Sequence, residues 1–304
     1  MSPLDFDTLW DYRHPDQTEA VFRQLLHEKT RIADPSYHVQ LLTQIARAQA
    51  LQRQFAEAHQ TLDQVKDQLQ PAWVIPTIRY ALERGRVFNS SGQPDEAQTW
   101  FQQAWELARG QEEAAFFAVD AAHMLAIAAS SFEEKVTWNQ MALDYAHASS
   151  DERARGWCGS LYNNLGWTYH EQGDYECALD SFQKALAWQQ EQGKTRESLI
   201  ARWCVGRTLR SLQRTTEALA LQQELLAAWE ESEEEQDGYV FEEIAECLLA
   251  LGRAAESRPY FAQAYAMLHQ DIWLVAQEKE RVERLKHLGE LSEEAGVPPQ
   301  QHGL

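Results

Sequence analysis

A pattern of about 40 residues repeats along this chain of 304 residues. Each copy has a short turn followed by an anchor position, and successive anchors lie 38, 39, 38, 43, 40 and 39 residues apart. The anchors are Ala20, Ala58, Ala97, Lys135, Ala178, Ala218 and Ser257. Periods of roughly 20 to 50 residues are typical of chains whose repeats stack on one another. We therefore expect a continuous array in which each repeat covers the apolar face of its neighbour.

Two other positions in the repeat support this expectation. The residues four after an anchor are bulky, as at Leu62, Phe101, Phe182 and Phe261. The residues twelve before an anchor are small, as at Ala46, Gly85, Gly166, Gly206 and Ala245. Small residues let two helices cross closely, and bulky residues fill the space beside the crossing. His123 stands at one of the small positions, and we expect it to pack in the core.

The repeats have the signature of helices. Apolar residues recur at steps of three and four, as at Leu161, Leu165 and Tyr169. Glycines such as Gly92 and Gly173 stand in short turns between these segments. No stretch alternates apolar and polar residues as a half-buried strand does. The sequence therefore predicts an all-α fold.

The clearest repeat, residues 161–186, resembles the tetratricopeptide repeat. It contains Leu165-Gly166, Tyr169, Gly173-Asp174-Tyr175, Ala178, Phe182 and Ala185 in the family's register. The resemblance covers about residues 1–290, with a period near 40 where the family usually has about 34. Such long repeats look like those of kinesin-light-chain-like and bacterial signalling-type arrays. The resemblance implies a right-handed α-solenoid of stacked antiparallel helix hairpins.

We expect a single repeat domain over residues 1–291, followed by a flexible tail at 292–304 that contains two adjacent prolines. Its repeats are expected near 1–37, 38–76, 77–114, 115–152, 156–195, 196–235 and 237–270, with a capping helix at 271–291. The acidic run at 230–238 is expected to be a solvated helix end and loop. The alternative is a docking segment for a basic partner.

The resemblance implies that the first helix of each hairpin lines a concave groove. Positions 18, 15, 11 and 8 residues before each anchor fall on one stripe of that helix. This stripe holds five arginines and three carboxylates, although the whole chain has 27 basic and 47 acidic residues and a net charge of −20. Arginine can bind a carboxylate or phosphate through two parallel hydrogen bonds. We therefore expect a groove for a peptide or helix with an acidic group and large apolar side chains.

The candidate groove residues are Arg47, Arg79, Arg86, Asn89, Phe117, Met124, Asn163, Trp167, His170, Trp203, Arg207 and Arg210. The arginines would engage acidic groups, the tryptophans, Phe117 and Met124 would hold apolar side chains, and Asn163 would bond the peptide backbone. His170 could add pH sensitivity. In the alternative interpretation, the arginines pair with neighbouring acids such as Glu83 and the tryptophans only pack between repeats.

The sequence contains no phosphate-binding glycine loop, zinc-protease motif or serine-hydrolase motif. We expect no catalytic site, no cofactor and no metal ion. The four cysteines are Cys158, Cys177, Cys204 and Cys247. They lack the spacing of a zinc site, and we expect small buried thiols in a reducing compartment.

Charge and hydropathy narrow the possible partners. A strongly acidic chain disfavours non-specific binding to nucleic acids and to anionic membranes. The sequence has no apolar stretch long enough to span a bilayer and no signal peptide at its start. We therefore expect a cytoplasmic protein.

These features favour a non-enzymatic adaptor that binds a peptide or helix of another protein. The first alternative is a bacterial regulatory module that binds a signalling peptide and controls an effector protein by a change of superhelical pitch. The second is self-assembly into a homodimer.

Overall fold

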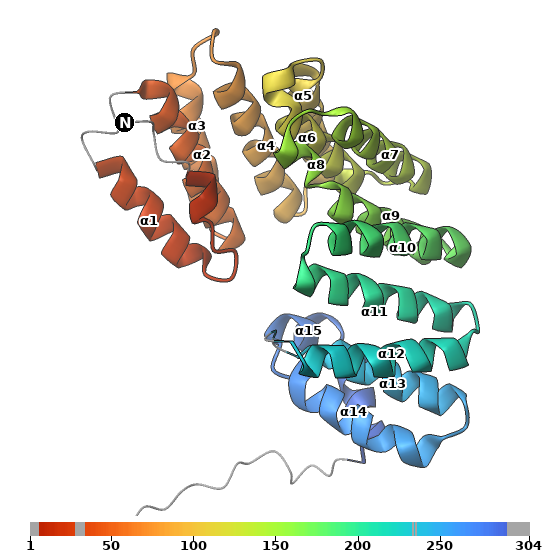
Figure 1. Cartoon of the computed structure of the whole chain (residues 1–304). Helices are drawn as coiled ribbons and strands as arrows, with labels where there is room; N and C mark the ends of the chain where they lie inside the picture. Colours follow the sequence, from red (N-terminus) through yellow and green to blue (C-terminus); the bar gives the residue numbers. More distant parts are fainter. Residues whose placement is uncertain (1–5, 28–33, 233, 235, 291–304) are drawn as a thin grey trace, which may run out of the picture. The chain divides into compact units, whose positions relative to one another are not determined.

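The computed structural model describes residues 6–27, 34–232, 234 and 236–290. This part of the chain is built of helices, and no β-strand occurs within it (Figure 1). Successive helices pair into antiparallel hairpins, and each hairpin packs on the next within its compact unit. The predicted all-α solenoid of stacked hairpins is confirmed.

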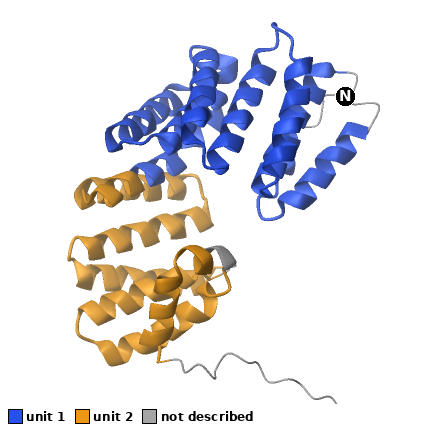
Figure 2. Cartoon of the chain, turned by 180° about the vertical axis from the view of Figure 1, so that it is seen from behind, with its two compact units in different colours: residues 1–165 blue, residues 166–304 orange. Residues whose placement is uncertain are grey.

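The chain divides into two compact units, Met1–Leu165 and Gly166–Leu304 (Figure 2). The helices of the first unit are η1 (Phe6–Leu9), α1 (Pro15–His27), α2 (Pro35–Leu51), α3 (Phe55–Gln68), α4 (Val74–Ser90), α5 (Pro94–Ala108), η2 (Glu112–Ala114), α6 (Ala115–Ala128), α7 (Phe132–Ala148) and α8 (Glu152–Arg155). The pairs α2/α3, α4/α5 and α6/α7 are hairpins. The first helix of each also contacts the first helix of the next.

The boundary between the units falls within α9 (Cys158–Gln172). The second unit continues with α10 (Tyr175–Glu191), α11 (Thr195–Ser211), α12 (Thr215–Glu230), α13 (Gly238–Ala250), α14 (Ala254–Leu268), α15 (Ile272–Gln277) and α16 (Lys279–Leu288). The first helices α11 and α13 are again in contact, and α16 packs on α14. The expectation that residues 1–291 form one domain stays a prediction.

Hairpins close where a small residue of the first helix meets a large residue of the second. A Cβ atom added to Gly85 of α4 would lie 2.6 Å from Cδ1 of Phe101 on α5. Gly166 of α9 faces the ring of Phe182 on α10 in the same way, also with 2.6 Å to the nearest ring atom. Both rings are fully buried. The spacing pattern in the sequence therefore marks these close crossings.

The N-terminal repeat differs from its expected form. Ala20, the expected anchor, is exposed. Within the described residues, only the short 3-10 helix η1 precedes α1, so Ala20 has no full helix there to pack against. Instead α1 contacts α2, and its buried side chains include Phe22 and Leu25.

In the repeat formed by α6 and α7, the larger residue at the helix crossing lies on the first helix and the smaller one on the second. His123 occupies the small position of α6 and is half-buried, with its ring 5.0 Å from that of Trp157. In α7, four residues after Lys135, the buried Asn139 stands where three other repeats have phenylalanine. A larger residue on the first helix thus goes with a smaller one on the second, and the expected packing role of His123 agrees with its surroundings.

The segment expected to be a single capping helix contains two helices. The backbone of Glu278, between α15 and α16, has φ −123° and ψ 42°, which interrupts the helix. Val282 and Leu285 of α16 are buried in a cluster with Phe261 of α14. The expected tail, 292–304, lies outside the described residues.

The acidic run between α12 and α13 is only partly exposed. Glu230 is exposed at the end of α12, as expected for a solvated helix end. Glu234 is half-buried and forms an ion pair of 3.4 Å with Arg196 of α11. Glu233 and Glu235 of this run lie outside the described residues.

All four cysteines are free thiols, and three of them are buried. Burial raises the pKa of the Cys204 and Cys247 thiols to about 12. Cys177 is exposed, so the expectation of four buried thiols is wrong at this position. It lies in the first turn of α10, where its backbone N–H bonds the capping carboxylate of Asp174.

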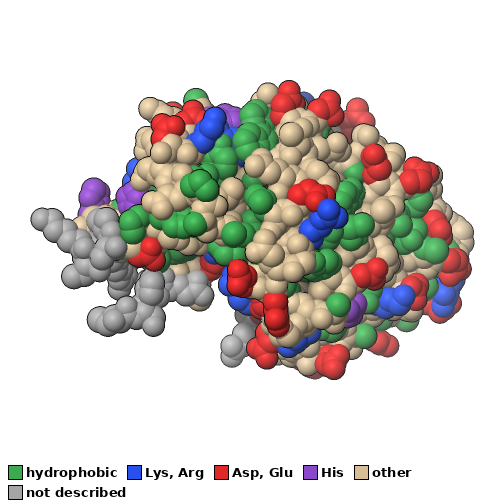
Figure 3. All heavy atoms as spheres, turned by 90° about the horizontal axis from the view of Figure 1, so that it is seen from above, with side chains coloured by type: hydrophobic (Ala, Val, Ile, Leu, Met, Phe, Trp, Pro, Cys, Tyr) green, Lys and Arg blue, Asp and Glu red, His purple; other side chains and the backbone are tan. Residues whose placement is uncertain are grey.

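The described helices include none long and apolar enough to cross a membrane. Figure 3 shows carboxylate side chains scattered over the face in view, between apolar and neutral groups. This distribution agrees with the excess of 47 acidic over 27 basic residues in the chain.

We predict that Gly85→Ala destabilises the protein by about 1–3 kcal/mol, because the new methyl group overlaps the Phe101 ring. Helix propensity alone would favour alanine by about 1 kcal/mol. The sign of the change in urea unfolding free energy therefore separates the two effects. The double variant Gly85→Ala/Phe101→Leu, which copies the natural pair Ala46 and Leu62, should recover part of the loss. A more stable Gly85→Ala variant would contradict the close crossing.

Candidate functional site

The first helices of the first unit form a cavity of about 420 Å³, which we call the α4 cavity. Its charged lining residues are Asp7, Arg47, Arg79, Glu83, Arg86, Asp120 and Arg153. Its aromatic lining residues are Trp10, Tyr12, Phe116, Phe117 and Trp157. Four arginines against three carboxylates leave one net positive charge. The cavity is therefore locally basic in a chain of net charge −20.

Arg86 of α4 is bonded to two carboxylates of the chain itself. Its guanidinium donates to Glu83 at 2.7 Å and to both oxygens of Asp120 on α6, at 2.5 and 2.6 Å. Burial alone would lower the pKa of Arg86, but the charges of Asp120 and Glu83 outweigh burial and raise it. Burial likewise favours a higher pKa for Asp120, but the arginines hold it below its usual range. Arg86 therefore stays charged and joins α4 to α6.

Arg47 of α2 is held much less tightly. Its Nη1 lies 3.6 Å from Oε1 of Glu83, which is too long for a good hydrogen bond. Its guanidinium lies 5.4 Å from the ring centroid of Trp10 and 5.3 Å from that of Tyr12. Among the described residues this guanidinium donates no hydrogen bond, so its N–H groups remain available to a ligand.

Arg79 of α4 binds Asp7, in the segment that precedes α1. Its Nη1 donates to Oδ1 at 3.0 Å and its Nη2 to Oδ2, which makes a two-pronged contact. The guanidinium lies 5.1 Å from the ring of Phe6 and 4.9 Å from the ring of Phe117. Arg153 also donates to Asp7, at 3.2 Å. The structure thus brings Arg79 and Phe117 together, around a carboxylate that the stripe pattern does not include.

A second cavity, of about 520 Å³, lies in the second unit, and we call it the α13 cavity. Its lining residues are Trp167, Trp203, Arg207, Arg210, Tyr239, Glu242, Glu243, Glu246, Glu278, Arg281 and Arg284. Here four arginines balance four glutamates. The predicted basic character is therefore absent when all eight groups are ionised.

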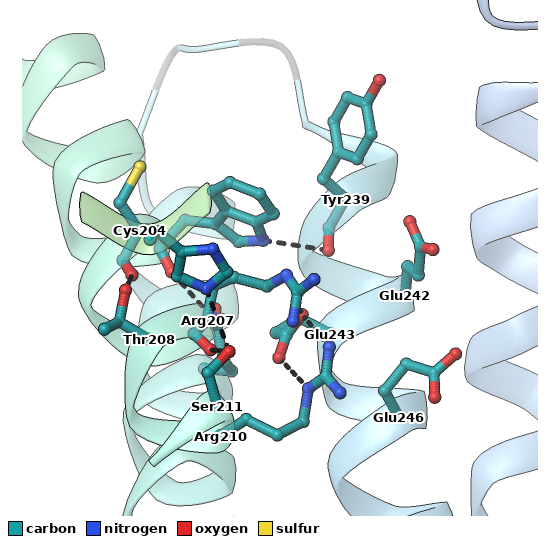
Figure 4. A network of polar contacts seen from close by, with 12 residues as sticks. Cys204, Arg207, Thr208, Arg210, Ser211, Tyr239, Glu242, Glu243 and Glu246 are labelled. Atoms are coloured by element: carbon teal, nitrogen blue, oxygen red, sulfur yellow. Dashed lines mark hydrogen bonds and ion pairs between the residues drawn. The ribbon is translucent and has the colours of Figure 1, made fainter. Parts of the chain in front are cut away.

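Glu243 of α13 is the central carboxylate of this cavity (Figure 4). Arg210 of α11 binds both of its oxygens, one of them at 3.1 Å, and Arg207 approaches it at 3.6 Å. Burial raises the pKa of Glu243 even though both arginines oppose that rise. Among the described side chains, Arg207 donates no hydrogen bond. Arg207 and Arg47 are therefore alike: each stands near a buried glutamate without being bonded to it.

The other glutamates of α13 bind the C-terminal cap. Arg281 of α16 donates to Glu242 at 2.8 and 2.6 Å, and Arg284 donates to Glu246, with one contact at 3.2 Å. Within this unit, α13 thus carries carboxylates that bond arginines from α11 on one side and from α16 on the other.

Two predicted tryptophans form one side of the α13 cavity. The ring centroids of Trp167 and Trp203 are 6.0 Å apart. Trp203 donates its indole N–H to the backbone carbonyl of Tyr239 at 3.1 Å, and Trp167 packs on Phe182 at 5.2 Å. Both indoles are half-buried. They therefore pack between repeats, as the alternative interpretation proposes, and also line the cavity.

His170 lies beside this cavity. Its Nε2 is 2.9 Å from the hydroxyl oxygen of Ser211, and its ring packs on Trp167 at 5.3 Å. Burial lowers the pKa of His170, and the positive charges of Arg207 and Arg210 lower it further. The ring is therefore held in its neutral form more strongly than that of a free histidine.

Four predicted residues do not line either cavity: His170, which lies beside the α13 cavity, and three others. Asn89 is half-buried near the end of α4, Met124 is buried in α6, and Asn163 is half-buried in α9. Asn163 and Trp167 also fall in different compact units.

The carboxylates are the residues that single-helix reasoning misses. Arg47 and Arg207 lie eleven residues before their anchors, and Glu83 and Glu243 lie fourteen before the next anchor. Each arginine thus precedes its glutamate by 36 residues. Comparing this spacing between consecutive repeats could have identified both pairs, whereas Asp7 and Arg153 follow no such pattern.

The chemistry of both cavities is that of binding. No group of three or more His, Cys, Asp and Glu side chains that could hold a metal ion occurs in the described part of the chain. Guanidinium groups beside aromatic rings are suited to a carboxylate with neighbouring apolar groups.

A sequence model of the tetratricopeptide repeat matches residues 159–192. None of the curated proteins matches the chain in sequence. RapI in its apo form is similar in structure with a TM-score of 0.67 and 13% identity, over 91% of this chain and 79% of that one.

Aspartyl phosphate phosphatase F from Bacillus subtilis has a TM-score of 0.57 and 13% identity, over 88% of this chain and 75% of that one. NprR in complex with its cognate peptide NprX has a TM-score of 0.51 and 16% identity, over 93% and 84%. At such identities the likeness shows the fold.

Residues 159–192 thus match the tetratricopeptide repeat in sequence, and the described helix pairs share the fold of the solved structures. This fold typically serves protein interaction.

We predict that His123 makes stability depend on pH between 6.5 and about 4. Burial lowers its pKa from 6.5 to about 4, with Asp120 opposing and Arg86 assisting the shift. Because the unfolded chain binds the proton first, unfolding free energy should fall by up to about 3 kcal/mol as pH drops through this window. His123→Phe should remove that slope in urea titrations at pH 7 and pH 5. Exposed His269→Phe is the control, and an unchanged slope in His123→Phe would contradict the assignment.

Proposed function

We propose that the chain binds a segment of a partner protein through the first helices of its hairpins. The proposal is supported by the two cavities, which those helices help to build and which are lined by eight of the twelve candidate residues. It includes no catalysis, no cofactor and no metal ion.

The observation that carries the proposal is that Arg47 and Arg207 are partly buried but donate no hydrogen bond to the described residues. Each guanidinium is already largely removed from water, with 26% and 31% of the side chain exposed. Each is 3.6 Å from a buried glutamate and donates no hydrogen bond to the described residues. A ligand carboxylate can accept hydrogen bonds from these two guanidinium groups without breaking an existing bond. Arg86 and Arg210, in contrast, would first have to release a carboxylate of the chain itself.

The surroundings of these arginines define the rest of the ligand. Trp10 and Tyr12 lie beside Arg47, and Trp203 and Tyr239 line the cavity of Arg207. A segment that combines a carboxylate with aromatic or large aliphatic side chains would match both cavities. The acidic surface of the chain disfavours nucleic acid and anionic membrane as partners.

The first candidate role is an adaptor that holds a partner protein. The second is a regulator that binds a signalling peptide, favoured by the likeness to NprR, whose structure contains its cognate peptide. Both roles use the same binding chemistry. A homodimer would remain compatible with either role, and we place the protein in the cytoplasm with residues 1–291 acting as one domain.

The test is a selection of random peptides on the full chain, followed by binding measurements on variants. Selected peptides should combine acidic and large apolar residues. Arg47→Glu should lower the affinity of peptides that bind in the α4 cavity, and Arg207→Glu that of peptides that bind in the α13 cavity. Each loss should be at least about tenfold, or about 1.4 kcal/mol.

The matched control is Arg214→Glu/Arg253→Glu, which reverses two exposed arginines at hairpin turns. It should leave affinity within about twofold, since exposed charges contribute little. Peptides that bind the Arg47→Glu and Arg207→Glu variants as tightly as they bind the natural chain would show that binding lies elsewhere.

A further inference from the structure

The chain contains a segment with the chemistry expected of the ligand. Residues 6–12 have the sequence Phe-Asp-Thr-Leu-Trp-Asp-Tyr, with a carboxylate next to a phenylalanine and two further aromatic residues close by. In the structure this segment forms part of the wall of the α4 cavity, of which Asp7, Trp10 and Tyr12 are lining residues.

The segment binds residues that are distant in sequence as well as its own neighbours, and the predicted groove residue Arg79 is among the distant ones. Asp7 takes hydrogen bonds from Arg79, 72 residues away, and from Arg153, 146 residues away. The Phe6 ring lies against the Arg79 guanidinium, at 5.1 Å. Trp10 donates its indole N–H to Oε1 of Gln44 at 3.0 Å. These contacts reach three separate helices, α2, α4 and α8.

The fit of this segment is incomplete. Arg79 is 8% exposed, yet its Nε is a buried donor without an acceptor in the described part of the chain. Glu83 is 2% exposed, and its Oε2 is a buried acceptor that receives no hydrogen bond there. Buried polar groups without partners are costly. One unused donor and one unused acceptor in the same cavity match the carbonyl and the N–H that a peptide backbone presents.

The far end of the segment is exposed, although Asp11 exchanges two hydrogen bonds with Thr18 of α1, at 3.1 and 3.0 Å. Tyr12 is 58% exposed and stacks on Trp10, with 4.9 Å between ring centroids. Arg47, which lies over both rings, gives them no hydrogen bond. Only Phe6 is buried in the core cluster of the first unit.

We propose that residues 6–12 are a built-in ligand of the α4 cavity, and that a partner peptide with a carboxylate beside aromatic residues binds there by displacing them. This inference rests on the proposed function and specifies its ligand and its control. In the free protein the segment competes with the partner, so only a peptide that binds more tightly than the segment opens the site. The tether gives the segment an effective concentration of about millimolar, which sets the threshold.

The test uses a labelled peptide with the sequence of residues 6–13 and the full chain. Fluorescence anisotropy measures its affinity for the natural chain and for Asp7→Lys, in which the segment is repelled by Arg79 and Arg153. The Asp7→Lys chain should bind the peptide at least about tenfold more tightly, because its own segment no longer competes. Hydrogen exchange over residues 6–12 should be faster in this variant.

Asp16→Lys is the matched control, since it makes the same charge change on the exposed first turn of α1. It should bind the peptide as the natural chain does. If Asp7→Lys folds poorly by circular dichroism, Asp7→Asn keeps the side-chain volume and should give a smaller gain of about threefold. Adding Arg79→Glu to either variant should abolish peptide binding.

Two results would overturn the inference. Residues 6–12 could exchange faster in the variants without any gain in peptide affinity, or they could stay protected in all variants. This test can be told apart from the test of the proposed function, because its probe peptide has the chain's own sequence and does not depend on finding a partner peptide by selection. Selected peptides could depend on Arg47 and yet bind the natural chain and Asp7→Lys with equal affinity. This result would support the proposed function but contradict the inference that residues 6–12 are a built-in ligand.

Discussion

The hairpins depend on one steric contact, a ring of the second helix against a part of the first helix that has no side chain. Gly85 and Gly166 provide that bare surface for Phe101 and Phe182. The long side chains of a first helix must then project from its other faces, where the next first helix is within reach. The ion pairs between α4 and α6, and between α11 and α13, follow from this arrangement. The candidate binding surface is thus a consequence of the packing behind it.

The sequence predicts the fold well because its determinants are local or strictly periodic. Apolar spacing and the anchor positions recur from hairpin to hairpin, and Gly92, Gly173 and Gly252 mark three of the hairpin turns. The same periodicity places Arg47 and Arg207 in cavities. It does not show that Arg86 is bonded to Asp120, because that carboxylate belongs to the next repeat and a stripe drawn on one helix omits it. The contact between Asp7 and Arg79 has no periodic relation at all, so no repeat analysis predicts it.

Electrostatics divides the predicted arginines into two kinds. Arg86 and Arg210 are bonded to buried carboxylates, and removing either partner would leave a charge without compensation. Arg47 and Arg207 are partly buried by the same helices, but their guanidinium groups donate no hydrogen bond to the described residues. The first kind holds neighbouring helices in register, and the second keeps donors oriented for another molecule. Of the five predicted arginines, Arg79, Arg86 and Arg210 are thus bonded to carboxylates of the chain, and Arg47 and Arg207 are available.

The N-terminal segment has a consequence for the order of events during synthesis. Residues 6–12 leave the ribosome before their partners, because Arg79 follows 72 residues after Asp7 and Arg153 follows 146 residues after it. The hairpins between them form from neighbouring stretches, so they can fold as they emerge. Until α8 has been made, the segment lacks one of its two cationic partners. The newborn chain therefore passes through a period in which its cavity is accessible, and it reaches the closed arrangement only after α8 has been synthesised.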